Sequence, residues 1–350
     1  MSEGGRDPGA GLSYRDAGVD LDAAERTKAR LKELVARTRD EHTLSELGAF
    51  GGLYQVPPGL DQPVLVSSAD GVGTKLKLAF RTGRHDTVGQ CLVNHCVNDI
   101  LVQGARPLFF LDYLASGAMD EEVVSAVVRG MALACGENGC ALLGGETAQM
   151  PDFYSPGEYD LAGFIVGIVE RTRILDGSRI RAGDVLVGLA SSGLHTNGYT
   201  LARTIVFQRM GLTVDDELPD AGRTVGEELL AVHRSYLPLL RGHLEAPWLH
   251  GLAHVTGGGI PGNLPRVLPG GLGARVDRDS WSVPAVFQTL REAGGVSRDE
   301  MDRVFNMGVG MIAIVGADGV DPLTNAADEA GIEAFVVGEV VEGHGVEYQG

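Results

Sequence analysis

The chain has 350 residues, of which 44% are apolar, 22% charged and 6% aromatic, and its formal net charge is −18 at pH 7. This composition indicates a folded protein, long enough for two domains, and excludes a disordered one. The negative charge argues against a nucleic-acid partner, because no local basic stripe overrides it.

The first eleven residues are rich in glycine and contain neither a basic start nor an apolar run. We expect a disordered tail at 1–11 that is neither a signal peptide nor an anchor. No run approaches 18 consecutive apolar residues, which argues against a membrane span. We therefore expect no membrane partner and a cytoplasmic location.

A charged helix is predicted next, with Asp20 or Asp22 as its N-cap and its end near Arg39. Beyond it, short apolar runs alternate with helical patterns. The elements expected in the first half are 64–67, 87–103, 108–114, 121–135, 141–143 and 161–169. Strands interleaved with helices predict an α+β fold of mixed α/β layers.

The segment 171–184, rich in Arg, Gly and Asp, is predicted to join two domains, at 12–170 and 171–350. The second domain repeats the layered pattern of the first. Its expected elements are strands at 185–190, 252–256, 308–315 and 334–341 and a helix at 199–208.

Four cysteines form two evenly spaced pairs, a spacing that suggests a zinc site: Cys91, Cys96, Cys135 and Cys140. Five helical positions turn the chain by about 140°, so the first pair cannot meet one metal ion. We favour free, buried cysteines.

The first candidate site is the end of the strand predicted near 64–67, where Asp70, Gly71, Gly73, Thr74 and Lys75 lead into a helix. A strand, a glycine turn and a helix can present backbone amides to phosphate. The segment matches neither the Walker A pattern nor the dinucleotide G-x-G-x-x-G pattern. A plain strand-to-helix turn is the alternative.

Asp99 lies in a helix that carries apolar residues around most of its circumference. A buried carboxylate needs a cation or strong donors, which means either a metal ion or a salt bridge to a residue such as Arg106. Asp70 and Glu146 also stand where apolar runs give way to glycine. Together the three acids favour a Mg²⁺ site for nucleotide phosphates, with Asp112 as a possible fourth member.

In the second half, the turn at 191–198 offers Ser192, His195 and Asn197 between a strand and a helix. His195 is able to polarise a carbonyl oxygen or move a proton near neutral pH. A capping or surface histidine is the alternative.

A glycine-rich segment follows at 256–266. Its glycines and nearby polar side chains form a candidate phosphate cradle, and a flexible turn is the alternative. The residues concerned are Gly257, Gly258, Gly259, Asn263 and Arg266.

Taken together, these motifs resemble the phosphoribosylformylglycinamidine cyclo-ligase family, also called aminoimidazole ribonucleotide synthetases. The resemblance implies that ATP phosphorylates the formyl oxygen of formylglycinamidine ribonucleotide, after which a nitrogen closes the imidazole ring with release of ADP and phosphate. The matching segments run in order along nearly the whole chain, at 12–20, 70–75, 97–100, 144–147, 191–198 and 257–266.

The same resemblance implies roles for individual residues. Asp70, Asp99 and Glu146 would manage Mg²⁺ and nucleotide, Lys32 and Lys75 would contact phosphates, and His195 would act on the formyl oxygen. Catalysis would rest on His195, Asp99 and Lys32. Substrate would be bound by Ser192, Asn197, Gly257, Gly258, Gly259, Asn263 and Arg266.

The nucleotide loop of the family corresponds to 46–53, with Gly48, Gly51 and Gly52, although Ser45 and Glu46 stand where glycines are expected. The resemblance further implies a homodimer in which the N-terminal sheet is completed across the interface, and a C-terminal α/β sandwich. A requirement for K⁺ is left open.

Four other protein classes compete with this interpretation. A small-molecule kinase resembling thiamine-phosphate kinase shares the metal and nucleotide plan, and a nucleotide-sensing dimer would not require His195 or the 257–266 loop. Selenophosphate synthetases usually carry a reactive Cys near the N-terminus, whereas no Cys precedes Cys91 here. A nicotinamide oxidoreductase lacks its glycine fingerprint.

Overall fold

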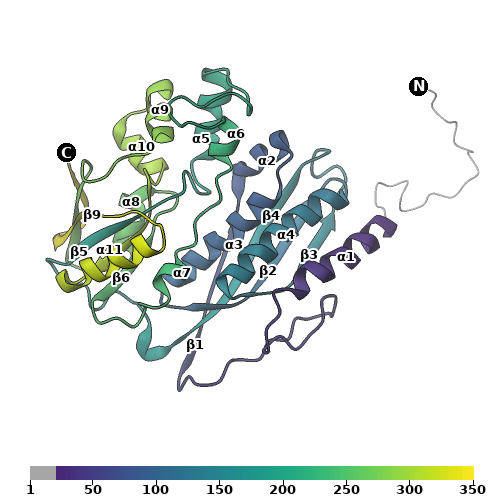
Figure 1. The fold of residues 1–350 in the computed structure, drawn as a ribbon, viewed down its shortest axis with the longest axis horizontal. Helices are drawn as coiled ribbons and strands as arrows, with labels where there is room; N and C mark the ends of the chain where they lie inside the picture. Colours follow the sequence, from purple (N-terminus) through teal and green to yellow (C-terminus); the bar gives the residue numbers. More distant parts are fainter. Residues whose placement is uncertain (1–20) are drawn as a thin grey trace, which may run out of the picture.

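The computed structural model describes residues 21–350, which form two layered domains side by side (Figure 1). The expected tail at 1–11 and the possible cap at Asp20 lie outside the described residues. The first sheet ends with strand β4 (Tyr159–Glu170) and the second begins with β5 (Val185–Ala190). The α+β class is confirmed, and the domain limits at 170/171 stay a prediction.

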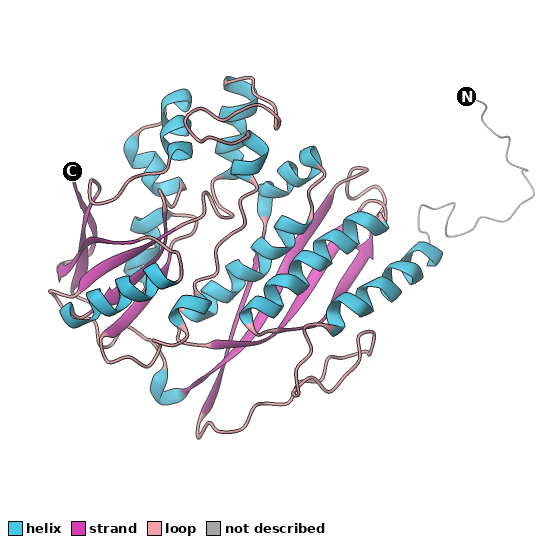
Figure 2. Cartoon of the chain, viewed as in Figure 1, coloured by secondary structure: helices cyan, strands magenta, loops and turns pink. Residues whose placement is uncertain are grey.

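The N-terminal sheet has the strand order β1-β4-β2-β3. Its other strands are β1 (Pro63–Gly71), β2 (Arg106–Ser116) and β3 (Ala141–Gln149). Helices α1 (Leu21–Ala36), α3 (Asp86–Leu101) and α4 (Glu121–Asn138) cover one face of it (Figure 2). The short elements after β1 are η1 (Gly73–Lys75) and α2 (Leu76–Thr82).

Helices α3 and α4 pack so closely that glycine is required at their contact. A Cβ atom at Gly89 would lie 2.2 Å from the Val127 carbonyl oxygen, and one at Gly130 would lie 1.9 Å from the Asp86 carbonyl oxygen. No side chain fits at such distances, so the two glycines fix how near the helices come.

The opposite face of the N-terminal sheet is apolar and open. Leu65 on β1 is 60% exposed and Phe164 on β4 is 45% exposed. On β2, Leu111 pairs with Phe164, and Tyr113 lies two residues further along the same face. Both side chains are half-buried. A sheet face of this kind is typical of a surface that packs against another element.

The C-terminal sheet has six strands in the order β10-β7-β9-β5-β8-β6. Strand β8 (Val309–Val315) is buried along its whole length, because its continuous apolar run lies between β5 and β6 (Leu249–His254). The remaining strands are β7 (Leu272–Asp277), β9 (Ala334–Glu342) and β10 (Gly345–Gln349).

Short helices surround this second sheet. They are α5 (Tyr199–Arg203), α6 (Val225–Leu229), α7 (Leu237–Leu240), α8 (Gly259–Asn263), α9 (Ala285–Gly294), α10 (Arg298–Val304) and α11 (Val320–Glu329). The helix expected at 199–208 is α5 continued by a π-helical turn, η3 (Thr204–Arg209). Single turns occur at η2 (Arg171–Arg173), η4 (Leu264–Arg266) and η5 (Ala317–Gly319).

Helix α3 joins the two domains through buried polar side chains. The Asn98 amide donates to the Arg234 carbonyl at 2.8 Å, and its oxygen accepts from the Tyr236 amide at 3.0 Å. Asn94 donates to the His233 carbonyl at 2.8 Å. These directional bonds fix the register of α3 against the chain at 233–236.

All four cysteines are free and buried, as the sequence predicts. Within residues 21–350, no helix has both the length and the apolar character needed to cross a membrane.

Candidate active site

A cleft of about 440 Å³ opens between the domains. One wall comes from β1 and the C-terminal half of α3, and the other from β6 and the chain that follows it. The side chains that matter for chemistry here are Ser68, Asp70, His95, Asp99, His254, Thr256, Asn263 and Arg266.

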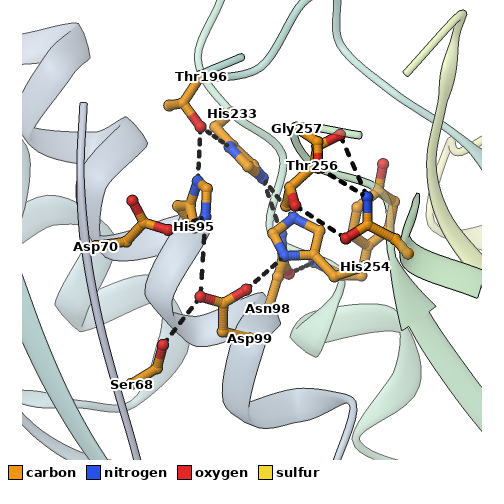
Figure 3. Close-up of polar contacts among 12 residues, drawn as sticks. Ser68, Asp70, His95, Asn98, Asp99, Thr196, His233, His254, Thr256 and Gly257 are labelled. Atoms are coloured by element: carbon orange, nitrogen blue, oxygen red, sulfur yellow. Dashed lines mark hydrogen bonds and ion pairs between the residues drawn. The ribbon is translucent and has the colours of Figure 1, made fainter. Parts of the chain in front are cut away.

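Two of the predicted acids meet in this cleft, each bound to a histidine (Figure 3). His95 Nε2 lies 2.8 Å from Asp70 Oδ2 and 3.8 Å from Asp99 Oδ2. His254 Nδ1 lies 2.8 Å from Asp99 Oδ1, and the Ser68 hydroxyl donates to Asp99 Oδ2 at 3.0 Å. Asp99 therefore has histidine partners in place of the salt bridge to Arg106 that was the alternative.

The electrostatics of the cleft keep both acids ionised. Burial raises the pKa of Asp70 and Asp99, but hydrogen bonds and positive charge from the histidines outweigh it and hold both pKa values below the ordinary range. Burial lowers the pKa of His95, and the bond to Asp70 with the nearby Asp99 charge overrides this and raises it. The two carboxylates thus favour the protonated form of His95.

A chain of hydrogen bonds runs from this cluster into the second domain (Figure 3). His95 Nδ1 lies 2.6 Å from the Thr196 hydroxyl, which lies 3.4 Å from His233 Nδ1. His233 Nε2 lies 3.1 Å from His254 Nε2. Burial lowers the pKa of His233 well below its usual value and also lowers that of His254, so these two rings stay neutral.

His195 lies behind this chain, with only 1% of its surface exposed. Its ring stacks on His233 at 3.9 Å between centroids, and its Nε2 accepts from the Ser192 amide at 3.2 Å. Its Nδ1 is buried without a partner among the described residues, and its φ of 59° is strained for a residue with a side chain. His195 does not face the cleft here, and its role on the formyl oxygen stays a prediction.

Lys75 departs from its expected place. Its ammonium is fully buried and donates to the His195 carbonyl at 2.8 Å, the Ala231 carbonyl at 2.6 Å and Cys91 Sγ at 3.2 Å. All three N–H bonds are used inside the domain junction. Tertiary packing turns the side chain away from the strand end, and the expected contact of Lys75 with phosphate stays a prediction.

The other residues of this predicted phosphate turn lie close to the cleft edge. Asp70 and Gly71 end β1, and the Gly71 amide donates to Asp70 Oδ1 at 2.7 Å. Gly73 has a φ of 61°, and the Thr74 hydroxyl lies 3.0 Å from that of Thr200 in the second domain. The strand-to-helix turn is present, and its contact with phosphate stays a prediction.

The predicted glycine loop of the second domain closes the other side of the cleft. Asn263 donates to the carbonyls of Gly257 at 3.3 Å and Gly259 at 2.8 Å, and Arg266 donates to Asn263 Oδ1 at 3.2 Å. Gly258 allows the turn with a φ of 100°. The loop thus holds a cationic side chain opposite the acids.

Asn197 and Ser192 lie deeper. The Asn197 amide nitrogen is buried with no partner among the described residues, and its oxygen would lie 3.2 Å from a Cβ at Gly257. The Ser192 hydroxyl donates to the Val232 carbonyl. Only Asn197 keeps an unused donor beside the glycine loop.

Lys32 and the loop at 46–53 meet at the other edge of the N-terminal sheet. Lys32 on α1 lines a small hollow with Glu46 and Leu143 of β3, and a Cβ at Gly48 would lie 4.0 Å from Lys32 Cε. A Cβ at Gly52 would lie 2.6 Å from Leu143, so the loop backbone approaches the strand closely. At Gly51 the neighbourhood is open.

Glu146 does not share the cleft with Asp70 and Asp99 within one chain, and its role as a metal ligand stays a prediction. It lies on β3, which is three interstrand spacings, about 14 Å, from β1. It also pairs with Tyr113, whereas Asp70 shares a row across the sheet with Gly163 and Asp112, so the side chains point to opposite faces. Within one chain, Asp70 and Glu146 cannot hold the same ion.

Asp112 lies near Glu146 and not in the cleft. A Cβ at Gly145 would lie 2.2 Å from Asp112 Oδ1, so the carboxyl packs directly on the neighbouring strand. Burial raises the pKa of Asp112 to about 7, with a further contribution from the charge of Glu146.

Three histidines of the junction were not predicted from the sequence: His95, His233 and His254. A signal for His95 exists, because Asn94, His95, Asn98 and Asp99 form polar pairs four residues apart in an otherwise apolar helix. His233 and His254 lie more than 130 residues beyond α3 and give no local signal.

The whole chain is similar to known proteins. Residues 53–169 match the family described as "AIR synthase related protein, N-terminal domain", and residues 181–350 match "AIR synthase related protein, C-terminal domain". A phosphoribosylformylglycinamidine cyclo-ligase of Sorangium cellulosum is 55% identical over 332 residues, which cover 94% of this chain and 95% of the relative. One of Trichlorobacter lovleyi is 51% identical and covers 94% of each.

Solved structures share the fold at lower identity. The thiamine-monophosphate kinase of Stenotrophomonas maltophilia superposes with a TM-score of 0.69 at 21% identity, over 95% of this chain and 97% of that one. The hydrogenase maturation protein HypE in complex with ATP gives 0.67 at 19%, over 93% and 89%. These similarities concern the fold alone.

Proposed function

The chain belongs to the AIR synthase related protein family, and we propose on that premise that it closes the imidazole ring of 5-aminoimidazole ribonucleotide. The substrates are ATP and formylglycinamidine ribonucleotide, as in the cyclo-ligases that share half its residues. The matches confirm the family predicted from the motifs.

The observation that carries this proposal is the interdomain cleft. Asp70 and Asp99 line one wall as ionised carboxylates, and Arg266 lines the other. Two carboxylates suit a Mg²⁺ ion, and a guanidinium suits the phosphate of a ribonucleotide. When bound, Mg²⁺ neutralises charge on the transferring phosphoryl group.

The reaction takes place in two transfers. The formyl oxygen attacks the γ-phosphorus, the bond from that phosphorus to the β,γ-bridging oxygen breaks, and ADP leaves. A nitrogen then attacks the formyl carbon, the C–O bond breaks, inorganic phosphate leaves, and the nitrogen loses a proton. Because their pKa values are low, Asp70 and Asp99 serve as cation ligands and not as acids in this sequence.

A homodimer is part of this proposal. The glycine loop with Lys32 and the acids Asp70 and Asp99 lie at opposite edges of one sheet, and α4 is packed between α1, which carries Lys32, and α3, which carries Asp99. A second copy packed on the open face around Leu65 and Phe164 would bring the β3 edge of one chain to the β1 edge of the other. Glu146 on the open face would then be available to the shared site.

The direct test mixes the purified protein with Mg-ATP and formylglycinamidine ribonucleotide and measures ADP and an aromatic amine by diazo coupling. We expect both products in equal amounts. ADP formed only with thiamine monophosphate would favour the kinase, and the absence of amine with ATP intact would refute the enzyme hypothesis.

Asp99→Asn should lower Mg-dependent turnover at least about 100-fold, because the cleft loses one of two charges that hold the cation. The circular dichroism spectrum should not change. Asp328→Asn, on the exposed side of α11, is the control and should keep full activity. Unchanged turnover in Asp99→Asn would remove this residue from the site.

A further inference from the structure

The acid cluster of the cleft contains nitrogen donors that a simple Mg²⁺ site does not need. His95 and Asp99 are four residues apart on α3 and so lie on one face of the helix. His254 reaches the same point from β6. One ligand atom each from His95, Asp99 and His254 fits within a mutual distance of 4.8 Å.

We propose that His95, His254, Asp70 and Asp99 form a mixed nitrogen and oxygen site that binds a first-row transition-metal ion, such as Zn²⁺, in preference to Mg²⁺. The inference rests on the proposed function in that it uses the same two carboxylates. Imidazole nitrogen suits zinc and its neighbours in the first row, whereas Mg²⁺ is bound almost wholly through oxygen.

The spacing of the donor atoms fits such an ion after side-chain movements. His95 Nε2 is 2.8 Å from Asp70 Oδ2, and His254 Nδ1 is 2.8 Å from Asp99 Oδ1. Donors bound tetrahedrally to one zinc ion at about 2.0–2.2 Å lie about 3.3–3.6 Å apart. The ligand atoms of His95, Asp99 and His254 lie within 4.8 Å of one another, so they have to approach by up to about 1.5 Å. Asp70 is outside this group of three and has to turn toward it to become the fourth ligand.

The groups around these ligands hold them in the orientation that metal-binding histidines need. The other ring nitrogen of His95 bonds the Thr196 hydroxyl at 2.6 Å, and that of His254 faces His233 Nε2 at 3.1 Å. Such outer bonds fix the ring plane of a metal ligand. The imidazoles are almost fully buried, at 3% and 7% exposed, while the carboxylates border the open cleft.

His195 does not belong to this site, although its ring lies near His233 and His254. Its ring is nearly parallel to that of His233, with 22° between the planes and 3.9 Å between the centroids. Two stacked imidazoles cannot both direct in-plane lone pairs at one ion. The site is therefore limited to the group that faces the cleft.

The competing interpretation is an ion cluster in which protonated His95 only neutralises Asp70 and Asp99. Direct metal binding separates the two interpretations without any substrate. The full-length protein is stripped with a chelator, titrated with Co²⁺ while its visible d–d absorption is recorded, and titrated with Zn²⁺ and Mg²⁺ by calorimetry. We expect one Co²⁺ per chain with an intense absorption typical of four-coordinate Co²⁺, and tighter binding of Zn²⁺ than of Mg²⁺.

His95→Gln, which keeps an N–H donor toward Asp70, should weaken Zn²⁺ binding at least about 100-fold, since a direct ligand contributes more than an outer partner. His250→Gln is the matched control. His250 lies on the same strand as His254 and also contacts an aspartate, Asp184, at 2.7 Å, but outside the cleft. It should leave Zn²⁺ binding unchanged. If His95→Gln does not fold, His254→Asn is the second variant.

Zn²⁺ affinity equal to that for Mg²⁺, or unchanged in both histidine variants, would overturn the inference. Turnover with Mg-ATP in a protein that shows no Co²⁺ absorption would refute this inference and leave the proposed function standing. Co²⁺ bound at the site of a protein that forms no amine would do the reverse.

Discussion

The polar groups at the two edges of the N-terminal sheet differ in whether the chain supplies their partners. At the β1 edge, Asp70 and Asp99 are bound by His95 and His254, and α3 is fixed to the second domain. At the β3 edge, Lys32 lies beside a glycine loop whose Phe50 is fully exposed, and Glu146 lies on the open face of β3. The first edge is completed within the chain, and the second has no such cover among the described residues.

Under the proposed function, a single chain assembles only half of a nucleotide site. The proposed cation ligands lie at one edge and the expected nucleotide loop at the other, separated by the breadth of four strands. A symmetric pair of sheets would place unlike edges together twice. We therefore predict that contact between copies, and not folding of the chain, limits activity.

The largest effect is expected from a charge on the open face. Phe164→Glu should convert the dimer to a monomer and lower turnover at least about 100-fold, because a buried, unpaired carboxylate costs several kcal/mol at an apolar interface. Analytical ultracentrifugation measures the mass. Leu133→Glu is the control, since Leu133 is 50% exposed but lies on α4, away from the open face. A dimeric, active Phe164→Glu variant would contradict the proposal.

Mixing two inactive variants tests whether the site is shared between two chains. Co-expressed Asp99→Asn and Lys32→Ala should regain about a quarter of the activity, because half of the dimers are mixed and each has one intact site. Mixing Asp99→Asn with Asp70→Asn damages the same edge twice and should restore nothing. Equal failure of both mixtures, with mixed dimers detected, would place all these groups in a single-chain site.

A moderate loss of stability is expected at the junction on the β1 side. Lys75→Met removes the donor to two buried carbonyls, of His195 and Ala231, and should cost about 1–3 kcal/mol of unfolding free energy. Urea denaturation gives this value from the midpoint and slope. Lys28→Met, on the exposed face of α1, should change little. A Lys75→Met variant as stable as the wild type would show that the buried ammonium is not needed at the junction.

Sequence alone predicted most of the fold, because apolar runs mark buried strands. Strand β5 and the start of α4 lie where the pattern placed them, whereas β7 and β10 were missed. Strands β7 and β10 are short, contain Gly, Arg and Glu, and lie at one end of the second sheet. Their alternation of apolar and polar residues is therefore weak.

The site was predicted less completely. Asp70 and Asp99 could be predicted for the site because a buried carboxylate needs a cation or strong donors, and this holds for each residue taken alone. The places of Lys75 and Glu146 depend on tertiary packing and on strand order, and neither is encoded in local spacing. His233 could not be predicted, because its contacts with His254 on β6 and with Asn98 on α3 form only when the chain folds.

The smallest effect concerns pH and again separates the two edges. Burial keeps His195, His233 and His254 neutral in the folded chain, with pKa values below the ordinary range. The unfolded chain binds these protons below about pH 6.5, so stability falls as pH drops through that value. His95 has the opposite effect, because its raised pKa adds stability that is lost as pH rises.

His233→Asn should remove the uptake of one proton on unfolding. It should therefore reduce the slope of unfolding free energy against pH by about 1.4 kcal/mol per pH unit between pH 6 and 5. The measurement is urea denaturation across this range, with His42→Asn, on the β3 side, as the control. An unchanged slope in His233→Asn would mean that this ring is already protonated in the folded chain, and the neutral hydrogen-bonded chain behind the cleft would have to be abandoned.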